Sequence, residues 1–267
     1  EGSGTHAFFL RGAVNGVVIE DVEITRFAIG INAQGSGPIR NITLRNSRLV
    51  LNTSMGMLGA YNDSLIEGNT FEANNASGSG FNHGTYLSGH GAGVQNVVLR
   101  NNRYLRNSVV SGGVCTGGNM TFHGILDNVL IEGNTILQDA ATEGCWLMSI
   151  TQGYNTAEGF THFVVRNNRL INGGNTAIAV QSAPGIVVEN NVIINTQTTP
   201  QTAISVGHNE YLNGDVPDGN AVVQNNTACY PTPHANSSVV RVIAPNSTVT
   251  NNILVTGAAA TTGICAH

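Results

Sequence analysis

Short runs of Val, Ile, Leu and Phe alternate with polar residues along the whole chain. One phrase recurs nine times: an apolar run, a polar residue, a small polar pair, and a second apolar run. Its copies read VVIEDVEI at 17–24, ITLRNSRL at 42–49, SLIEGNTF at 64–71, VVLRNNRY at 97–104, VLIEGNTI at 129–136, FVVRNNRL at 163–170, IVVENNVI at 186–193, AVVQNNTA at 221–228 and TVTNNILV at 248–255. Alternation over such short runs predicts β-strands joined by corners rather than amphipathic helices.

The second residue of each polar pair forms a column through the repeat. Its members are Asp21, Asn46, Asn69, Asn102, Asn134, Asn168, Asn191, Asn226 and Asn252, spaced 23 to 35 residues apart. Asn tolerates the left-handed backbone of a sharp corner, and stacked Asn side chains can bond to one another. The repeat therefore predicts an all-β parallel β-helix, a solenoid of about nine coils with an Asn ladder. A β-sandwich gives no reason for one Asn per coil.

On this Asn-bearing repeat, the chain resembles the right-handed parallel β-helix superfamily of pectate lyases, polygalacturonases, alginate lyases and phage tailspikes. The resemblance extends from His6 to His267. It implies a secreted, extracellular protein, or one on a virion surface, that acts on a long acidic polysaccharide. The repeat fills 1–267 without a capping helix, so we expect a single domain that is either a piece of a longer chain or capped by a partner.

Composition narrows the set of partners. The chain holds 34 Asn and 11 Arg but no Lys, and its formal net charge is −5. A slightly acidic chain has no electrostatic footprint for nucleic acid, and no apolar run is long enough to span a membrane. We therefore expect neither nucleic acid nor membrane as a partner. A secreted enzyme of this size is expected to be a monomer, and a tailspike-like stalk a trimer.

Four repeats are longer than the rest. Those that end at Asn102, Asn134, Asn168 and Asn226 take 32 to 35 residues, whereas the others take 23 to 26. The extra residues must leave the coil as loops, and loops on a rigid scaffold commonly carry function. Because three of the long repeats are consecutive, we expect their loops to form the walls of one groove.

The strand before each Asn-bearing strand shows which side chains face outward. Alternation predicts inward positions for Ile29, Ile31, Leu58, Leu87, Met120, Phe122, Ile178, Val180, Ile204 and Val206. It predicts outward positions for Asn32, Tyr86, Ser88, Thr121, His123 and Gln181, while CWLMS at 145–149 lets Trp146 face either way. Coils stack ~4.8 Å apart, so Tyr86, Ser88 and His123 should lie within reach of one bound sugar.

This outward cluster suits acid–base chemistry on a uronic acid. We expect His123 and Tyr86 to transfer protons, assisted by His83 or His90. β-Elimination also requires the substrate carboxylate to be neutralised, by the amide of Asn82 or Gln181 or by an arginine such as Arg106. Ser88, Thr121 and Trp146 complete the expected substrate-binding set. The similar families often use Lys as the base, and without Lys that role falls to His, Tyr or Arg.

Two other functions fit the same sequence. A glycoside hydrolase needs two carboxyl groups about 5–10 Å apart, and the insert residues Asp127, Glu143 and Glu158 could supply them. A non-catalytic tailspike or adhesin would use the coil to bind glycan or to provide length. We therefore expect a polysaccharide lyase first and a hydrolase second. The third hypothesis, a glycan-binding or structural rod, belongs to a different functional class because it is not an enzyme.

Two further features concern ligands and cross-links. Insert 207–220 gathers Glu210, Asp215 and Asp218, whose oxygens suit calcium, although a solvated loop explains them equally well. Calcium is the one cofactor that the sequence suggests.

Cys115 and Cys145 precede the same strand column in neighbouring coils and could form a disulfide, whereas we expect Cys229 and Cys265 to lie on different faces as free thiols.

Overall fold

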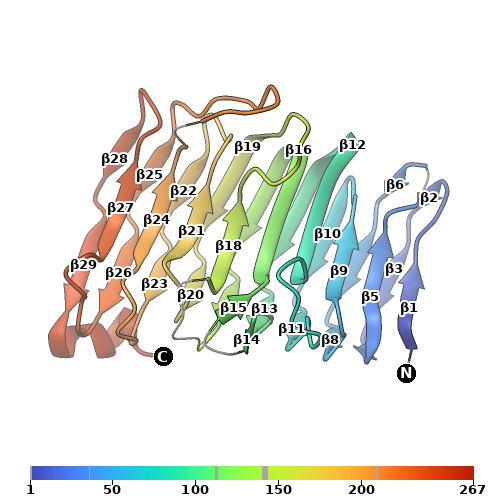
Figure 1. The fold of residues 1–267 in the computed structure, drawn as a ribbon, viewed down its shortest axis with the longest axis horizontal. Coiled ribbons are helices and arrows are strands. Elements are labelled where there is room, and N and C mark those ends of the chain that lie inside the picture. The colour runs from blue at the N-terminus through green and yellow to red at the C-terminus, as the bar shows by residue number, and fades with distance from the viewer. Residues whose placement is uncertain (1, 36, 112–113, 140–143, 209) are drawn as a thin grey trace.

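The computed structural model describes residues 2–35, 37–111, 114–139, 144–208 and 210–267. These residues form a column of stacked coils, drawn from blue to red along its length in Figure 1. Within this part of the chain, every pair of neighbouring strands is parallel except one short hairpin. Two faces of the column each hold an uninterrupted row of nine strands, which confirms the expected all-β solenoid of about nine coils.

Each coil contributes strands to three faces. The first face holds β1 (Gly2–Phe9), β5 (Phe27–Ala33), β9 (Met55–Gly59), β12 (His83–Arg100), β16 (Gly118–Glu132), β18 (Trp146–Ile150), β21 (Thr176–Val180), β24 (Thr202–Val206) and β27 (Ser238–Val242). The second holds β3 (Val18–Glu20), β7 (Thr43–Arg45), β10 (Ser64–Glu67), the ends of β12 and β16, β19 (Gly159–Arg166), β22 (Val187–Glu189), β25 (Val222–Gln224) and β28 (Thr248–Thr250). The third holds β4 (Glu23–Thr25), β8 (Arg48–Val50), β11 (Thr70–Glu72), β13 (Arg103–Leu105), β17 (Thr135–Leu137), β20 (Arg169–Ile171), β23 (Val192–Ile194), β26 (Thr227–Tyr230) and β29 (Ile253–Thr256).

The remaining elements are short. Strands β2 (Val14–Asn15) and β6 (Ile39–Arg40) pair in parallel, and β14 (Val109–Ser111) and β15 (Val114–Thr116) form the antiparallel hairpin. The helices among the described residues are two 3₁₀ turns, η1 (Gly257–Thr261) and η2 (Gly263–Cys265). None of the described helices is long and apolar enough to cross a membrane.

The core runs through the middle of the coils, as the alternation predicts. Eight expected inward residues lie in the main apolar core, and Leu58 is buried outside it; the eight are Ile31, Leu87, Met120, Phe122, Ile178, Val180, Ile204 and Val206. The prediction is wrong for Leu58, which pairs with the outward Tyr86, while Met57 takes the inward position. A slip of one residue moves a strand's side chains to the other face, and MGML gives no polar residue to fix the phase. Ile29 is only partly buried.

The Asn ladder is present. The first residue of the polar pair forms the corner of the coil, and the second residue forms the ladder. The first residue of the pair takes the left-handed corner, with φ of 56° at Asn101 and 57° at Asn167. The second residue bonds to the next coil, so that Asn102 Nδ2 donates to Asn134 Oδ1 at 3.1 Å. Side-chain links of 2.8–3.1 Å run through Asn69, Asn102, Asn134, Asn168, Asn191, Asn226 and Asn252.

The first two members of the predicted column are wrong by one residue. Asp21 and Asn46 have φ of 55° and 51°, so both are corner residues. Ser47 occupies the ladder position instead, and its backbone N–H donates to Asn69 Oδ1 at 2.9 Å. The corner needs a residue that tolerates positive φ, and because Asn serves both positions, the sequence alone does not separate them.

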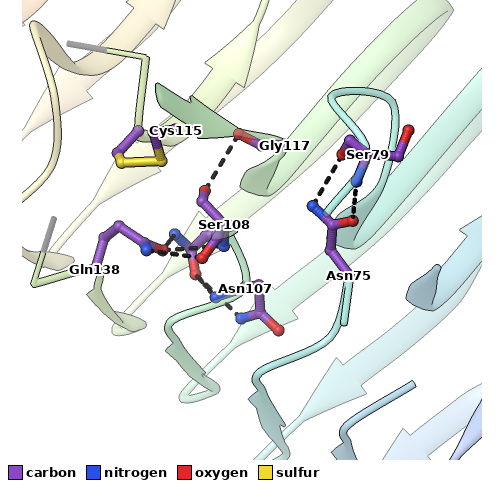
Figure 2. Close-up of a disulfide and its surroundings, with 9 residues drawn as sticks. Asn75, Ser79, Asn107, Ser108, Cys115, Gly117 and Gln138 are labelled. Atoms are coloured by element: carbon purple, nitrogen blue, oxygen red, sulfur yellow. Dashed lines mark hydrogen bonds between the residues drawn. A yellow bond between two sulfur atoms is a disulfide. The ribbon is translucent and has the colours of Figure 1, made fainter. Parts of the chain in front are cut away.

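The structure adds a second ladder that the sequence analysis missed. It lies between the third and first faces and links Asn52, Asn74, Asn107, Asn119 and Gln138 at 2.8–3.0 Å. Figure 2 shows its end at Asn107 and Gln138. The coil exterior carries a third column, on the second face, where Glu20, Glu67 and Glu132 pair with Arg45, Arg100 and Arg166. Side chains therefore join neighbouring coils at two corners and on the second face, and the ion pairs Arg48–Glu23 and Arg106–Asp139 do so on the third face.

Two disulfides tie inserts and the C-terminal segment to the coil. Cys115 is bonded to Cys145, as expected, and joins the β14–β15 insert to the next coil (Figure 2). The expectation of free thiols at Cys229 and Cys265 is wrong, because these residues form the second disulfide. The 3₁₀ turns bring Cys265 back over the third face, where Arg169 donates to the carbonyl of Ile264 at 2.8 Å. Strand alternation does not predict this reversal.

Candidate active site

A hollow of about 710 Å³, here called the main hollow, opens on the first face of the coil. Its floor comes from β12, β16 and β18, and its walls come from inserts of the three consecutive long coils. This arrangement confirms the groove expected from the repeat lengths. The lining residues are Gly80, Phe81, His83, Tyr86, Cys115, Gly117, Gly118, Thr121, His123, Gly144, Trp146, Ser149, Thr151, Gln152, Gly153, Tyr154 and Gln181.

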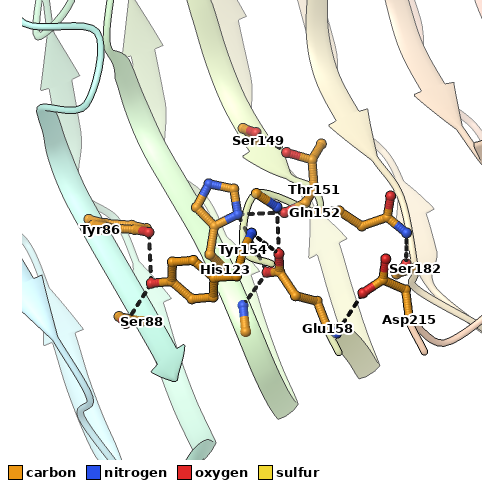
Figure 3. Close-up of polar contacts among 12 residues, drawn as sticks. Tyr86, Ser88, His123, Ser149, Thr151, Gln152, Tyr154, Glu158, Ser182 and Asp215 are labelled. Carbon is orange, nitrogen blue, oxygen red and sulfur yellow. Dashed lines mark hydrogen bonds and ion pairs between the residues drawn. The ribbon is translucent and has the colours of Figure 1, made fainter. Parts of the chain in front are cut away.

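His123 stands on β16 with a defined tautomer. Its Nδ1 lies 2.6 Å from the carbonyl oxygen of Thr151 (Figure 3). A carbonyl oxygen can only accept a hydrogen bond, so Nδ1 carries the proton and Nε2 of the neutral ring has a free lone pair. The strand and the Thr151 carbonyl thus hold an imidazole base ready in the main hollow.

Behind the imidazole lies Glu158, whose side chain is completely buried. Its carboxylate accepts hydrogen bonds from the backbone N–H groups of Gly124, Gly153 and Tyr154, and Oε2 lies 3.6 Å from His123 Nδ1 (Figure 3). Burial alone raises the pKa of this carboxyl, but the bonds from His123 and the three N–H groups outweigh burial and lower it. Glu158 therefore stays ionised and stabilises a positive charge on His123.

Two tyrosines complete the proton-handling groups. The hydroxyl of Tyr86 donates to that of Tyr154 at 2.8 Å, and Ser88 Oγ lies 2.8 Å from the same Tyr154 oxygen (Figure 3). Both rings lie 5.4 Å from the His123 ring, measured between centroids. Burial, followed by the bond to Tyr154, raises the pKa of Tyr86, so its hydroxyl keeps its proton. A base and two phenolic acids therefore lie close together in the main hollow, His123 and Tyr86 on its floor and Tyr154 on its wall.

His83 faces the same hollow in a neutral form. Its Nδ1 lies 3.2 Å from Thr121 Oγ1, and its ring packs edge-on against Tyr86. Loss of hydration, and secondly the repulsion that His123 exerts when it is protonated, lower the pKa of His83 to about 3. At neutral pH this residue contributes a hydrogen bond and no charge.

The lowered pKa of His83 makes the fold sensitive to acid. Between its folded pKa of about 3 and the ordinary value of 6.5, the unfolded chain binds a proton that the folded chain does not, so stability falls as pH falls. His83→Asn keeps a polar atom near Thr121 but does not titrate. We expect the loss of melting temperature from pH 7 to pH 5 to be smaller in this variant by ~2–4 °C. Equal losses in both proteins would show that His83 protonates freely in the fold.

The other expected site residues are divided between the hollow and the outside. Thr121, Trp146 and Gln181 line the main hollow, and Trp146 faces outward with 37% of its surface exposed. The amide of Asn82 donates to Ser77 Oγ within its own loop. Arg106 follows β13 on the third face, where it forms an ion pair with Asp139 at 2.8 Å, so the structure does not bring it to the hollow. His90 lies in β12, and its side chain is outside the described part of the structure.

The insert carboxylates have structural partners. Asp127 bonds to Thr161 and His162 at the start of the second face, and Glu143 lies outside the described residues. Asp215 accepts the backbone N–H of Glu158 at 2.8 Å, and Asp218 accepts those of Ser182 and Ala183. Insert 207–220 therefore braces the back of the site.

These bonds leave little room for calcium. Asp215 and Asp218 are buried and already accept backbone N–H bonds, while Glu210 is exposed in its loop. The described residues contain no group of three or more His, Cys, Asp or Glu placed to hold a metal ion. The donor set expected in insert 207–220 does not fit a calcium site.

Sequence reasoning missed Tyr154 and gave Glu158 a different role. Both lie in the loop after β18, which has no alternating pattern to align with a coil. The available signal was a Tyr and a Glu in the insert beside the His123 coil. The position of the Glu158 side chain depends on three backbone N–H bonds that no linear pattern specifies.

Comparison with known proteins identifies the architecture. No family model and no curated protein matches the sequence. The A-module of mannuronan C-5 epimerase AlgE6 from Azotobacter vinelandii superposes with a TM-score of 0.58 at 16% identity, and that of AlgE4 with 0.57 at 18%. This chain is a right-handed parallel β-helix. The β-helix is covered over 91% of its length in both superpositions but spans only 61% and 60% of those two chains.

Proposed function

We propose that this β-helix is a polysaccharide lyase that cleaves an acidic, uronate-containing polysaccharide by β-elimination. The observation that carries the proposal is the His123 imidazole, with Nδ1 2.6 Å from the carbonyl oxygen of Thr151, beside a linked pair of tyrosine hydroxyls. Elimination needs one base and one acid near the same sugar, and side chains able to serve as both lie close together in the main hollow.

The proposed reaction begins at the carbon next to the carboxylate. Nε2 of His123 takes the C5 proton, and the C–H electron pair moves into the carboxylate as an enolate. Glu158, 3.6 Å from Nδ1, stabilises the imidazolium that forms. The amide of Gln181 and the hydroxyl of Thr121, both in the lining, are positioned to hold the substrate carboxylate.

Bond cleavage then uses the tyrosine pair. The enolate electrons form the C4–C5 double bond as the C4–O4 bond breaks, and the leaving oxygen receives the Tyr154 proton. Tyr86, which donates to Tyr154, returns a proton to it through their shared hydrogen bond. His123 finally releases the C5 proton to solvent and Tyr86 takes a proton back from solvent, so the products are an unsaturated sugar at a new non-reducing end and a new reducing end.

A second candidate, a polyuronate C-5 epimerase, shares the first step. The two similar structures carry the name mannuronan C-5 epimerase, which favours this alternative. In an epimerase, the enolate is protonated again at C5 from the opposite side and the C4–O4 bond stays intact.

We propose an extracellular location for either enzyme, because all four cysteines form disulfides, which persist in oxidising compartments.

One experiment separates these functions. The protein is incubated in D₂O with alginate, pectate, glycosaminoglycans or bacterial capsules, and the products are analysed by near-ultraviolet absorbance and NMR. A lyase gives an unsaturated product, whereas an epimerase gives deuterium at C5 of an uncleaved chain. New reducing ends with neither signal would contradict both and indicate a hydrolase. Binding without any change in the polymer would indicate a non-catalytic rod.

A further inference from the structure

The main hollow continues along the coil axis into a second hollow. The second hollow, of about 170 Å³, lies over β21, β24 and β27. Trp146, Thr151 and Gln181 line both hollows, so the two share a border. Together they form one groove that crosses several coils on the first face.

Strand register shows what the floor of this groove contains. Tyr86, Thr121 and Ser149 pair across neighbouring strands, and the same column continues through Ala179 and Ser205. Small side chains at these last two positions leave the groove open. The next residue of the column is Arg241 on β27, which pairs with Ser205 and lines the second hollow. A long cationic side chain therefore follows a run of small ones.

The side chain of Arg241 is free to bind a ligand. It is exposed, and within the described part of the chain its guanidinium has neither a hydrogen bond nor an ion pair, whereas Arg45, Arg100 and Arg166 are each paired with Glu. His208 lines the same hollow, and the described lining contains no Asp or Glu. A guanidinium without an acidic neighbour suits a carboxylate from outside.

We propose that Arg241 binds a carboxylate of the same polysaccharide at a distance from the reacting sugar, so that the polymer lies along the coil axis. This inference rests on the proposed function. Arg241 is four coils from His123, or ~19 Å at the usual strand spacing. Since a pyranose is about as long as one strand spacing, Arg241 binds the carboxylate of a sugar unit about four units from the one at His123. Trp146, on the shared border, offers its ring to a sugar in between.

Binding to a protein that cannot turn over its substrate tests the inference. In a His123→Asn background, we compare Arg241→Gln, Arg241→Lys and Arg103→Gln for binding to a long polyuronate and to its trisaccharide. We expect Arg241→Gln to raise the Kd for the polymer ~5-fold and to weaken its salt dependence, while the trisaccharide Kd is unchanged. Arg241→Lys should recover part of the loss. Arg103 is exposed on the third face, so Arg103→Gln is a control of equal charge change.

The outcomes distinguish this inference from the proposed function. An unchanged polymer Kd in Arg241→Gln, or an equal loss for the trisaccharide, overturns the Arg241 subsite and leaves the chemistry at His123 standing. Arg241-dependent binding by a protein that neither cleaves nor epimerises any polyuronate supports the subsite and overturns the proposed lyase. No binding of any polyuronate overturns both.

Discussion

His123→Asn is expected to lower kcat on a polyuronate by ~10²–10⁴-fold, the usual contribution of a positioned general base. The side-chain amide of Asn reaches the position of Nδ1, so it can still donate to the Thr151 carbonyl that His123 contacts at 2.6 Å. The variant lacks the far side of the ring, including Nε2, which takes the proton. Steady-state kinetics, together with a melting temperature, measure the effect and separate it from unfolding.

His162→Asn is the matched control. This histidine is exposed, its Nδ1 is paired with Asp127, and it lies on β19 of the second face, so its loss should leave kcat unchanged.

Tyr86→Phe removes the hydroxyl that donates to Tyr154 and should lower kcat with little effect on KM. If His123→Asn and Tyr86→Phe both retained full activity, the site would lie elsewhere on the coil.

Asn134→Ala is expected to lower the free energy of unfolding by about 3–4 kcal/mol, because it interrupts the ladder in its middle. The Asn134 amide donates to Asn168 and to the carbonyl of Leu99, and its oxygen accepts from both the backbone and the side chain of Asn102. All these groups are buried, so their lost partners cannot be replaced by water without opening the coil. Urea denaturation followed by circular dichroism gives the change.

Asn15→Ala provides the comparison for the ladder. Asn15 also accepts a hydrogen bond from an Asn of the next coil, Asn41, at 2.7 Å, but this pair is exposed to solvent. Water replaces the lost bond there, so we expect a change within ~0.5 kcal/mol. Equal destabilisation by the two variants would contradict a special role for the buried ladder.

The sequence was sufficient to predict the coil and the floor of the site, because both depend on periodicity. Strand alternation places His123 outward on β16, and the constant Asn column puts Tyr86 on the neighbouring coil, where β12 and β16 pair. The length differences between repeats were enough to locate the walls. The Asn-bearing phrase recurs in every coil and resets the alignment there, so one error in a single coil does not propagate.

The remaining features depend on contacts that do not repeat. Glu158 is positioned by backbone N–H groups from two separate segments, and Cys265 reaches Cys229 only because the last coil turns back on itself. Asn46 and Ser47 show the same limit at a smaller scale. Either residue is compatible with the corner or the ladder, and the choice is made by the neighbouring coil.

The number of coils in the column of small residues that leads to Arg241 sets the distance between the two ends of the groove. The distance along the groove between the reacting sugar and the sugar bound by Arg241 is a whole number of strand spacings. Ala179 and Ser205 each belong to one of the coils between the floor of the main hollow and Arg241. Insertion or loss of one coil between β21 and β24 would move Arg241 by ~4.8 Å, about one sugar residue, without altering the coils that hold His123. Gene duplication of a single repeat could thus change the length of polymer that is recognised while leaving its chemistry intact.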